Sequence, residues 1–206
     1  DRVLRSGMLA QGPEVKAFEE EFSATVGGRH CVAMNSGTSG LHLGFIAAGV
    51  ERGDEVIVPS FSFAATANSV ALAGASPIFA DIDPKTFNMD PDHVETLITK
   101  KTKAIMPVHL YGHIAAMDRY QEISSKHGVK IIEDAAQGHL ASLNGRNAGE
   151  FGVCATFSFY PTKNMTAGEG GMVVTDDAEV ARMLRLLRNQ GQKIRYQNEV
   201  VGFNTR

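Results

Sequence analysis

The sequence predicts an α/β fold in which a mostly parallel sheet carries helices on both faces. Short apolar runs, of the kind that form buried strands, alternate along the chain with segments of helical periodicity. Glycine accounts for 21 of the 206 residues and marks many of the boundaries between these segments. Strands that alternate with helices pair in parallel, and the helices then cover both faces of the sheet. The predicted architecture is a three-layer α/β/α sandwich.

The first half of the chain alternates helices and strands. Pro13 favours the first turn of a helix, and apolar residues at helical spacing continue it to Val26. Gly27 and Gly28 end this helix. The expected elements that follow are a strand over 30–34, a helix from the glycine-rich segment after it to residue 49, strands over 56–58, 77–80 and 104–108, and helices over 64–73 and 90–98.

The second half continues the alternation and brings carboxylates to the end of a strand. A helix is expected over 117–127, and a strand over 129–132 leads directly into Glu133 and Asp134. Two more strands are expected over 155–159 and 172–174, and a helix over 177–189, with the arginines from 182 to 188 on a solvated face. Ligands bind at the carboxyl ends of the strands in such sheets, so the residues after each strand are the candidates for function.

Composition and charge exclude several classes of protein. The chain is 43% hydrophobic and 21% charged, which excludes a disordered or fibrous chain. The formal net charge of −3 gives no basic face for nucleic acid. Its apolar runs are too short to span a membrane, and no signal-peptide pattern opens the sequence, so we expect a cytoplasmic protein. Cys31 and Cys154 are expected as buried free thiols.

No metal site is expected. His109 and His113 are four residues apart, but Gly112 between them disfavours the helix that would align them. The acidic residues from 81 to 90 lack the glycine and the terminal glutamate of a calcium-binding loop. We expect them to act in turns and as the cap of the following helix.

The segment after the first strand has the composition of an anion site. Asn35-Ser36-Gly37-Thr38-Ser39-Gly40 leads directly into a helix, so free backbone N–H groups lie at a positive helix end. Phosphate is the natural ligand of such a site, although serine and threonine also cap helices for structural reasons alone. The segment matches neither the phosphate loop of nucleotide hydrolases nor the dinucleotide-binding fingerprint.

Two further strand ends supply a carboxylate and an amine. Asp134 follows a buried strand, where a carboxylate needs a cation or a protonated ligand nitrogen unless it caps the next turn. Lys163 follows another strand in a loop rich in small residues, where it is either solvated or able to form an imine. An anion site, a strand-end carboxylate and a loop lysine together match the needs of pyridoxal 5′-phosphate.

Several stretches spread over nearly the whole chain resemble the DegT-type sugar aminotransferases, which use pyridoxal phosphate to aminate nucleotide-linked keto sugars. The matching stretches are GPEV from Gly12 with Phe18-Glu19, NSGTSGLHL from Asn35, PSFSFAATANSV from Pro59, PVHLYG from Pro107, EDAAQ from Glu133, FSFYPTKNMTAGEGG from Phe157 and LRNQG from Leu187. The resemblance implies the large domain of the fold type I, or aspartate-aminotransferase-like, enzymes. It also implies that residues 1–206 are an incomplete large domain, with the small C-terminal domain outside this chain.

The same resemblance assigns roles to individual residues. It implies that Lys163 forms the Schiff base with the cofactor and moves the proton of transamination, and that Asp134 pairs with the pyridine nitrogen. The implied cofactor-binding residues are Gly37, Thr38, Phe63, Asp134, Gln137, Ser158, Lys163 and Asn204. Among these, Phe63 would stack on the ring, Gln137 would contact the phenolic oxygen, and Asn204 would reach the phosphate of a neighbouring subunit.

The implied activity is transfer of an amino group from glutamate to a nucleotide-linked keto sugar, in a homodimer with shared active sites. His109 is a candidate for the sugar side of the pocket, and Glu169 is expected to have a structural role in the lysine loop. Three alternatives stay open. The first is other pyridoxal-phosphate chemistry on the same fold, such as a sugar dehydratase or a lyase, and the second is a non-catalytic sensor. The third, a plain nucleotide-binding α/β domain, is disfavoured by the missing phosphate-loop motifs. Retention of Lys163 favours transamination over dehydration, because dehydrating relatives tend to carry histidine there.

Overall fold

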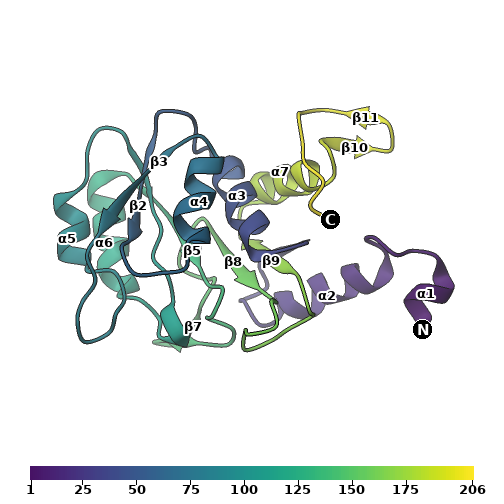
Figure 1. Ribbon diagram of the computed structural model, residues 1–206, viewed down its shortest axis with the longest axis horizontal. Helices are drawn as coiled ribbons and strands as arrows, with labels where there is room; N and C mark the ends of the chain where they lie inside the picture. The colour runs from purple at the N-terminus through teal and green to yellow at the C-terminus, as the bar shows by residue number, and fades with distance from the viewer.

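The structure, a computed structural model, describes residues 1–206 and has a seven-stranded central sheet in the spatial order β1-β9-β8-β5-β4-β2-β3 (Figure 1). The strands are β1 (His30–Met34), β2 (Glu55–Pro59), β3 (Ser76–Ala80), β4 (Thr102–Ile105), β5 (Lys130–Asp134), β8 (Cys154–Ser158) and β9 (Gly171–Thr175). β9 pairs antiparallel with both of its neighbours, and every other pair in the sheet is parallel. The carboxyl ends of all strands but β9 therefore lie at one edge of the sheet.

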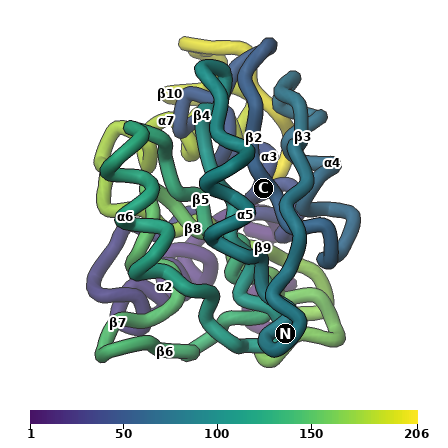
Figure 2. The backbone as a smooth tube through the Cα atoms, turned by 90° about the vertical axis from the view of Figure 1, so that its left-hand side faces the viewer, coloured from purple at the N-terminus to yellow at the C-terminus, as the bar shows by residue number.

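Helices cover both faces, which completes the predicted three layers. The helices are α1 (Arg2–Ser6), α2 (Pro13–Ser23), α3 (Gly37–Ala47), α4 (Ala65–Leu72), α5 (Pro91–Thr96), α6 (Met117–His127), α7 (Ala178–Arg188) and the 3₁₀ turn η1 (Leu110–Gly112). The side chains of α3, α4 and α7 share one hydrophobic cluster with the sheet. Those of α5 and α6 form a second cluster on the opposite face, and α2 contributes to a third there. Figure 2 shows α4 and α6 on opposite sides of the strands.

The predicted elements are all present, and two of their boundaries are displaced by three residues. The first helix ends at Ser23 instead of Val26, and a short turn leads to the glycines. The strand expected to reach Val108 ends at Ile105, and Val108 makes only an isolated parallel bridge with Asp134. Pro107 lacks an amide hydrogen and so interrupts the regular hydrogen bonds of the strand. Its carbonyl still accepts the N–H of Asp134, so the chain continues beside the end of β5.

Two hairpins, α1 and the 3₁₀ turn η1 were not predicted. β6 (Ser142–Leu143) and β7 (Arg146–Asn147) are joined by Asn144 and Gly145, whose φ angles are 52° and 78°. Asn-Gly is the strongest short-range signal for this kind of turn, so the sequence did carry the information. β10 (Gln192–Ile194) pairs with β11 (Gln197–Asn198), and this hairpin projects from the same side of the molecule as α1 (Figure 1). None of the helices is long and apolar enough to cross a membrane.

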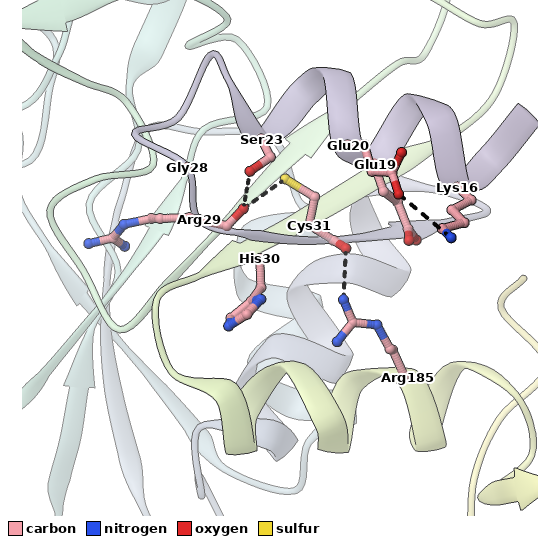
Figure 3. Close-up of a pocket in the computed structure, with 9 residues that line it drawn as sticks. All are labelled: Lys16, Glu19, Glu20, Ser23, Gly28, Arg29, His30, Cys31 and Arg185. Atoms are coloured by element: carbon pink, nitrogen blue, oxygen red, sulfur yellow. Dashed lines mark hydrogen bonds and ion pairs between the residues drawn. The ribbon is translucent and has the colours of Figure 1, made fainter.

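The outer edge of β1 is covered by side chains instead of another strand, and Figure 3 shows one of them, Arg185, beside the carbonyl of Cys31. The carboxylate of Glu19 accepts the N–H of Ala33 at 2.8 Å, and the guanidinium of Arg188 donates to the carbonyl of Ala33 at 2.9 Å and to Glu19 at 2.6 Å. Arg185 donates to the carbonyl of Cys31 at 3.5 Å. Arg188 is buried, so its expected place on a solvated face was wrong. Capping an exposed edge in this way prevents pairing with another chain.

A hollow of about 500 Å³ lies beside this edge, between α2 and α7. Its lining mixes both signs of charge, including the exposed pair Lys16 and Glu20. The thiol of Cys31 is buried beneath it, and burial raises the pKa of this thiol to about 12, so the thiol stays protonated and unreactive. None of the predicted site residues lines this hollow.

Candidate functional site

A second cavity, of about 570 Å³, opens at the carboxyl edge of the sheet. Every predicted site residue except Asn204 lines it: Gly37, Thr38, Phe63, Asp134, Gln137, Ser158 and Lys163. These residues come from the ends of β1, β2, β5 and β8 and from the segments that follow. The other lining residues are Ser36, Leu41, Ala65, Thr66, Ala136, Tyr160, Thr162 and Glu169. The sequence predicted that the carboxyl ends of the strands would bring these residues together, and the structure confirms this.

The positive end of α3 forms one wall of the cavity. Ser36 caps the helix, and its side chain accepts the N–H of Ser39 at 3.1 Å. The N–H groups of Gly37 and Thr38 precede the first intrahelical bond and have no partner within the helix. Ser158 closes the wall from β8 and is buried. Backbone N–H groups and hydroxyls at a helix end are the donors that a phosphate group requires.

Glycines let α3 approach β8 closely enough to build this wall. A Cβ added to Gly37 would lie 2.8 Å from the Cβ of Ser158, and one added to Gly40 would lie 2.6 Å from a methyl carbon of Thr156. Gly44, one turn further, is looser: its added Cβ would lie 3.5 Å from the sulfur of Cys154. The packing is therefore tightest at the end of the helix that faces the cavity.

Gly171 fixes the other side of the same turn. It begins β9, and a Cβ there would lie 2.3 Å from the carbonyl oxygen of Ser36 and 2.8 Å from the nitrogen of Gly37. No side chain fits this space. The sequence showed Gly171 only as part of a glycine-rich loop, although consecutive glycines directly before a strand are a signal for close backbone approach.

Asp134 is buried at the floor of the cavity and is held by two donors. Its Oδ1 accepts the N–H of Ala136 at 3.1 Å, and its Oδ2 accepts the hydroxyl of Thr66 at 3.0 Å. Burial raises the pKa of Asp134 above its ordinary value, and the two hydrogen bonds and the positive charge of Lys163 offset only part of that shift. The carboxylate is therefore short of favourable partners. The contact with Thr66 was not predicted.

Glu133, the preceding residue, points to the other face of the sheet. Its carboxylate accepts a hydrogen bond from Nε2 of His109 at 2.9 Å and three more from the N–H groups of Gly149, Phe151 and Gly152. Burial acts to raise the pKa of Glu133, but His109 and the backbone N–H groups reverse this and leave the pKa below its ordinary value. His109 is fully buried and does not line the cavity, so its suggested place beside a sugar was wrong.

Gln137 and Phe63 offer the remaining contacts. The side-chain oxygen of Gln137 accepts the N–H of Tyr111 at 2.7 Å, so the side-chain NH₂ group is the donor left for the cavity. Tyr111 adopts a left-handed conformation, with φ 54° and ψ 23°, which is uncommon outside glycine and often marks functional sites. The ring of Phe63 is 77% exposed, so its face is free for a flat ligand.

Lys163 and Asn204 occupy different surroundings. Lys163 is half-buried in the segment after β8, where its N–H donates to the carbonyl of Tyr160 at 3.0 Å, and its side chain lines the cavity. Asn204 is exposed near the C-terminal end, forms a bridge with Asn189, and contributes nothing to the cavity of its own chain. Its contribution to a neighbouring subunit stays a prediction.

The residues of this cavity fit pyridoxal phosphate. The helix end and Ser158 suit a phosphate, Asp134 suits a protonated ring nitrogen, and the Gln137 amide suits a phenolate oxygen. The exposed face of Phe63 suits the ring itself. No group of three or more potential metal ligands is present.

Comparisons with known proteins agree with this chemistry. The chain is 49% identical over 197 residues to a GDP-perosamine synthase of Caulobacter vibrioides, covering 95% of this chain and 53% of that protein. It is 48% identical over 207 residues to a pleiotropic regulatory protein of Geobacillus stearothermophilus, covering 100% of this chain and 56% of that protein. The crystal structure of Streptomyces venezuelae DesV with a ketimine intermediate superposes with a TM-score of 0.95 at 45% identity, covering all of this chain and 56% of DesV.

The chain thus spans about half the length of the relatives it matches. The fold agrees with the large domain of the fold type I pyridoxal-phosphate enzymes, as the sequence predicted. The family model for the DegT/DnrJ/EryC1/StrS aminotransferase family matches residues 1–206. The chain belongs to the DegT/DnrJ/EryC1/StrS aminotransferase family.

Proposed function

We propose that the complete protein carrying this chain is a pyridoxal-phosphate-dependent aminotransferase that moves an amino group from glutamate to a nucleotide-linked keto sugar. The observation that carries the proposal is the meeting of Asp134, Lys163 and the positive end of α3 around one cavity. Each feature alone has a structural explanation, whereas their combination suits this cofactor and the chemistry of the family.

The binding residues divide into three groups by what they hold. Gly37, Thr38 and Ser158 offer the donors for the phosphate. Phe63 offers the face on which a ring would stack, and the amide NH₂ group of Gln137 is the donor available for an oxygen on that ring. Together they would hold the cofactor in one position before any substrate binds.

Asp134 and Lys163 carry the chemistry. When bound, pyridoxal phosphate supplies an aldehyde that condenses with amines and a ring that takes up an electron pair. Asp134, ionised, keeps a proton on the ring nitrogen, which strengthens that uptake. The amine of Lys163 would hold the cofactor and, when free, would accept a proton from one carbon and deliver it to another.

The choice of substrate rests on the relatives. One of them is named for a GDP-linked amino sugar, and the family name describes aminotransferases. The cavity has a volume of about 570 Å³, and most of the residues that line it are polar or small. Glutamate and the keto sugar use this space in turn, because both halves of a transamination share one site.

We also propose that the protein is a homodimer in which Asn204 completes the partner's phosphate site. Large apolar residues are exposed at both ends of the chain: Leu4, Met8 and Leu9 near α1, and Tyr196 and Val201 near the β10–β11 hairpin. These two segments lie on the same side of the molecule (Figure 1). Exposed apolar patches of this kind mark interaction surfaces, and Asn204 lies beside one of them.

The test of the proposed function is reduction of the complete, folded protein with borohydride after addition of pyridoxal phosphate. A reduced adduct should map to the peptide with Lys163. The variant Lys163→Ala should lose the adduct and at least about a thousandfold of its turnover, because a nucleophile and proton carrier has been removed. The control is Lys100→Ala, because Lys100 is exposed and lies away from the cavity. This variant should keep both the reduced adduct and the turnover.

The outcome also separates the alternatives. No adduct in the complete protein would overturn the proposal and favour a non-catalytic sensor, for which the relationship to a regulatory protein is the supporting observation. An adduct on Lys163 together with loss of water from the sugar, instead of gain of an amino group, would favour a dehydratase.

A further inference from the structure

We propose that Thr66 is a positioning residue that holds the Asp134 carboxylate in the orientation needed to meet a ring nitrogen, and that Ser62 fixes the Thr66 hydroxyl in turn. The inference rests on the proposed function. It concerns residues of α4 and of the segment before it, outside the strand that carries Asp134.

Two donors from different elements determine the plane of the Asp134 carboxylate. Ala136 binds Oδ1 from the chain just after β5, and Thr66 binds Oδ2 from the first turn of α4, 68 residues away in sequence. Rotation about the last bond of an aspartate is soft, so one donor leaves the plane of the carboxylate loosely defined. The second donor fixes it.

Thr66 is well suited to this task. Its side chain is 2% exposed, and a β-branched side chain has few rotamers available. Its hydroxyl also lies 2.8 Å from the hydroxyl of Ser62. An ionised carboxylate only accepts hydrogen bonds, so Thr66 gives its single proton to Asp134 and must accept one from Ser62. The hydrogen bonds therefore run in one direction: Ser62 donates to Thr66, and Thr66 donates to Asp134.

The electrostatics point the same way. Burial raises the pKa of Asp134, and the Thr66 hydroxyl is one of the groups that oppose this shift. The group that opposes it most is the N–H of Ala136, which binds the other oxygen. Losing Thr66 thus makes Asp134 both less well oriented and easier to protonate, and a protonated carboxyl cannot form an ion pair with a pyridinium.

The test compares two cofactors that differ at one atom. Cofactor-free complete protein is titrated with pyridoxal 5′-phosphate and with its 1-deaza analogue, which has C–H in place of the ring nitrogen. Thr66→Val keeps the shape of the side chain and removes the hydroxyl. Thr66→Val should weaken the binding of pyridoxal phosphate about tenfold, because a hydrogen bond to a charged group contributes about that much to an affinity. It should weaken the binding of the analogue less than about twofold.

Three controls distinguish positioning from general damage. Thr66→Ser should restore most of the affinity, because it restores the hydroxyl. Thr175→Val removes a buried hydroxyl that binds the carbonyl of Val153 outside the cavity, so it should leave the ratio of the two affinities unchanged. Ser62→Ala should reduce the affinity for pyridoxal phosphate by a smaller factor than Thr66→Val.

Equal weakening of both cofactors by Thr66→Val, or no weakening of either, would overturn the assignment while leaving the proposed function intact. If Thr66→Val fails to fold, Ser62→Ala and Thr66→Ser decide, and an unchanged affinity ratio in Ser62→Ala contradicts the directed chain. If the unaltered protein forms no adduct at Lys163, the proposed function fails and this inference fails with it.

Discussion

Glu133 and Asp134 are neighbours at the end of one strand, yet their surroundings shift their pKa values in opposite directions. Glu133 faces the side of α2, α5 and α6, where four hydrogen bonds from His109 and the backbone satisfy it, and its pKa lies below the ordinary value. Asp134 faces the side of α3 and α4, where two hydrogen bonds do not offset burial, and its pKa is raised. The alternation of side chains along a strand produces this separation.

The difference distinguishes a carboxylate that maintains the fold from one that awaits a ligand. Glu133 ties β5 to the segment from Gly149 to Gly152 and to His109, and it has no polar capacity left to offer. Asp134 keeps an unmet demand for positive charge, and it lies in the cavity. A perturbed pKa therefore points to function only where the perturbing groups leave the carboxylate unsatisfied.

The largest expected effect on stability is at Glu133, the carboxylate that has its full set of hydrogen bonds. Glu133→Gln places an NH₂ group against N–H donors and removes the charge beside His109. Breaking one member of a buried, fully bonded set should lower the free energy of unfolding by about 3 kcal/mol. Hydrogen exchange should localise the damage to the amides of Gly149, Phe151 and Gly152, which bind Glu133.

Glu20→Gln is the matched control, because Glu20 is exposed and its partner Lys16 lies 3.8 Å away. Its effect should stay within about 0.5 kcal/mol. Equal effects of the two substitutions would contradict the view that Glu133 maintains the fold.

The next effect concerns the helix that faces Asp134 across the cavity. Gly40→Ala would bring a methyl group within 2.6 Å of Thr156, so α3 must shift or strain, at a cost of about 2 kcal/mol. Gly44→Ala on the same helix meets only an ordinary contact of 3.5 Å with Cys154 and should be neutral or stabilise by up to about 1 kcal/mol. Thermal unfolding of both variants, with and without pyridoxal phosphate, checks the difference.

If both alanine variants behave alike, the close packing does not determine the position of the helix end. If Gly40→Ala lowers stability and also weakens phosphate binding, the position of this helix end is coupled to the anion site.

The sequence was sufficient for the order of the elements and for most of the cavity, because both depend on local patterns. Strand ends in a parallel sheet lie at one edge, so Asp134 and Lys163 could be brought together without knowing any contact. Thr66, by contrast, binds a residue 68 positions away, and Arg188 binds one 169 positions away. The periodicity of a sequence gives no information about contacts between residues so far apart. For that reason the arginine-rich helix was expected to face solvent.

Other features were within reach of the sequence and were missed. The spacing of Gly37, Gly40 and Gly44 places all three on one face of a helix, which indicates close packing against a neighbour. His109 could not be read as a partner of Glu133, since a histidine after a strand suits a pocket and a core equally well. The choice between a pocket and a core position for His109 depended on which face of β5 the side chains of Glu133 and Asp134 occupy.

The smallest effect, and the one with the opposite sign, is expected at Asp134. In cofactor-free protein, Asp134→Asn removes a buried charge whose pKa is raised, so it should stabilise the fold by about 1 kcal/mol at neutral pH while weakening cofactor binding. A raised pKa means that the folded state binds more protons than the unfolded state, so the wild-type protein loses stability from this group as pH rises above about 3.9. The gain from Asp134→Asn should therefore vanish below that pH.

The destabilisation caused by Glu133→Gln should also shrink as pH falls below about 4.3. The pKa of Glu133 is lowered in the folded state, so its carboxylate stabilises the fold in full only at pH values above the ordinary pKa of a glutamate. Unfolding of both variants and the wild type from pH 3 to pH 8 measures the two trends, and a destabilising Asp134→Asn at neutral pH would mean that the aspartate, like the glutamate, maintains the fold.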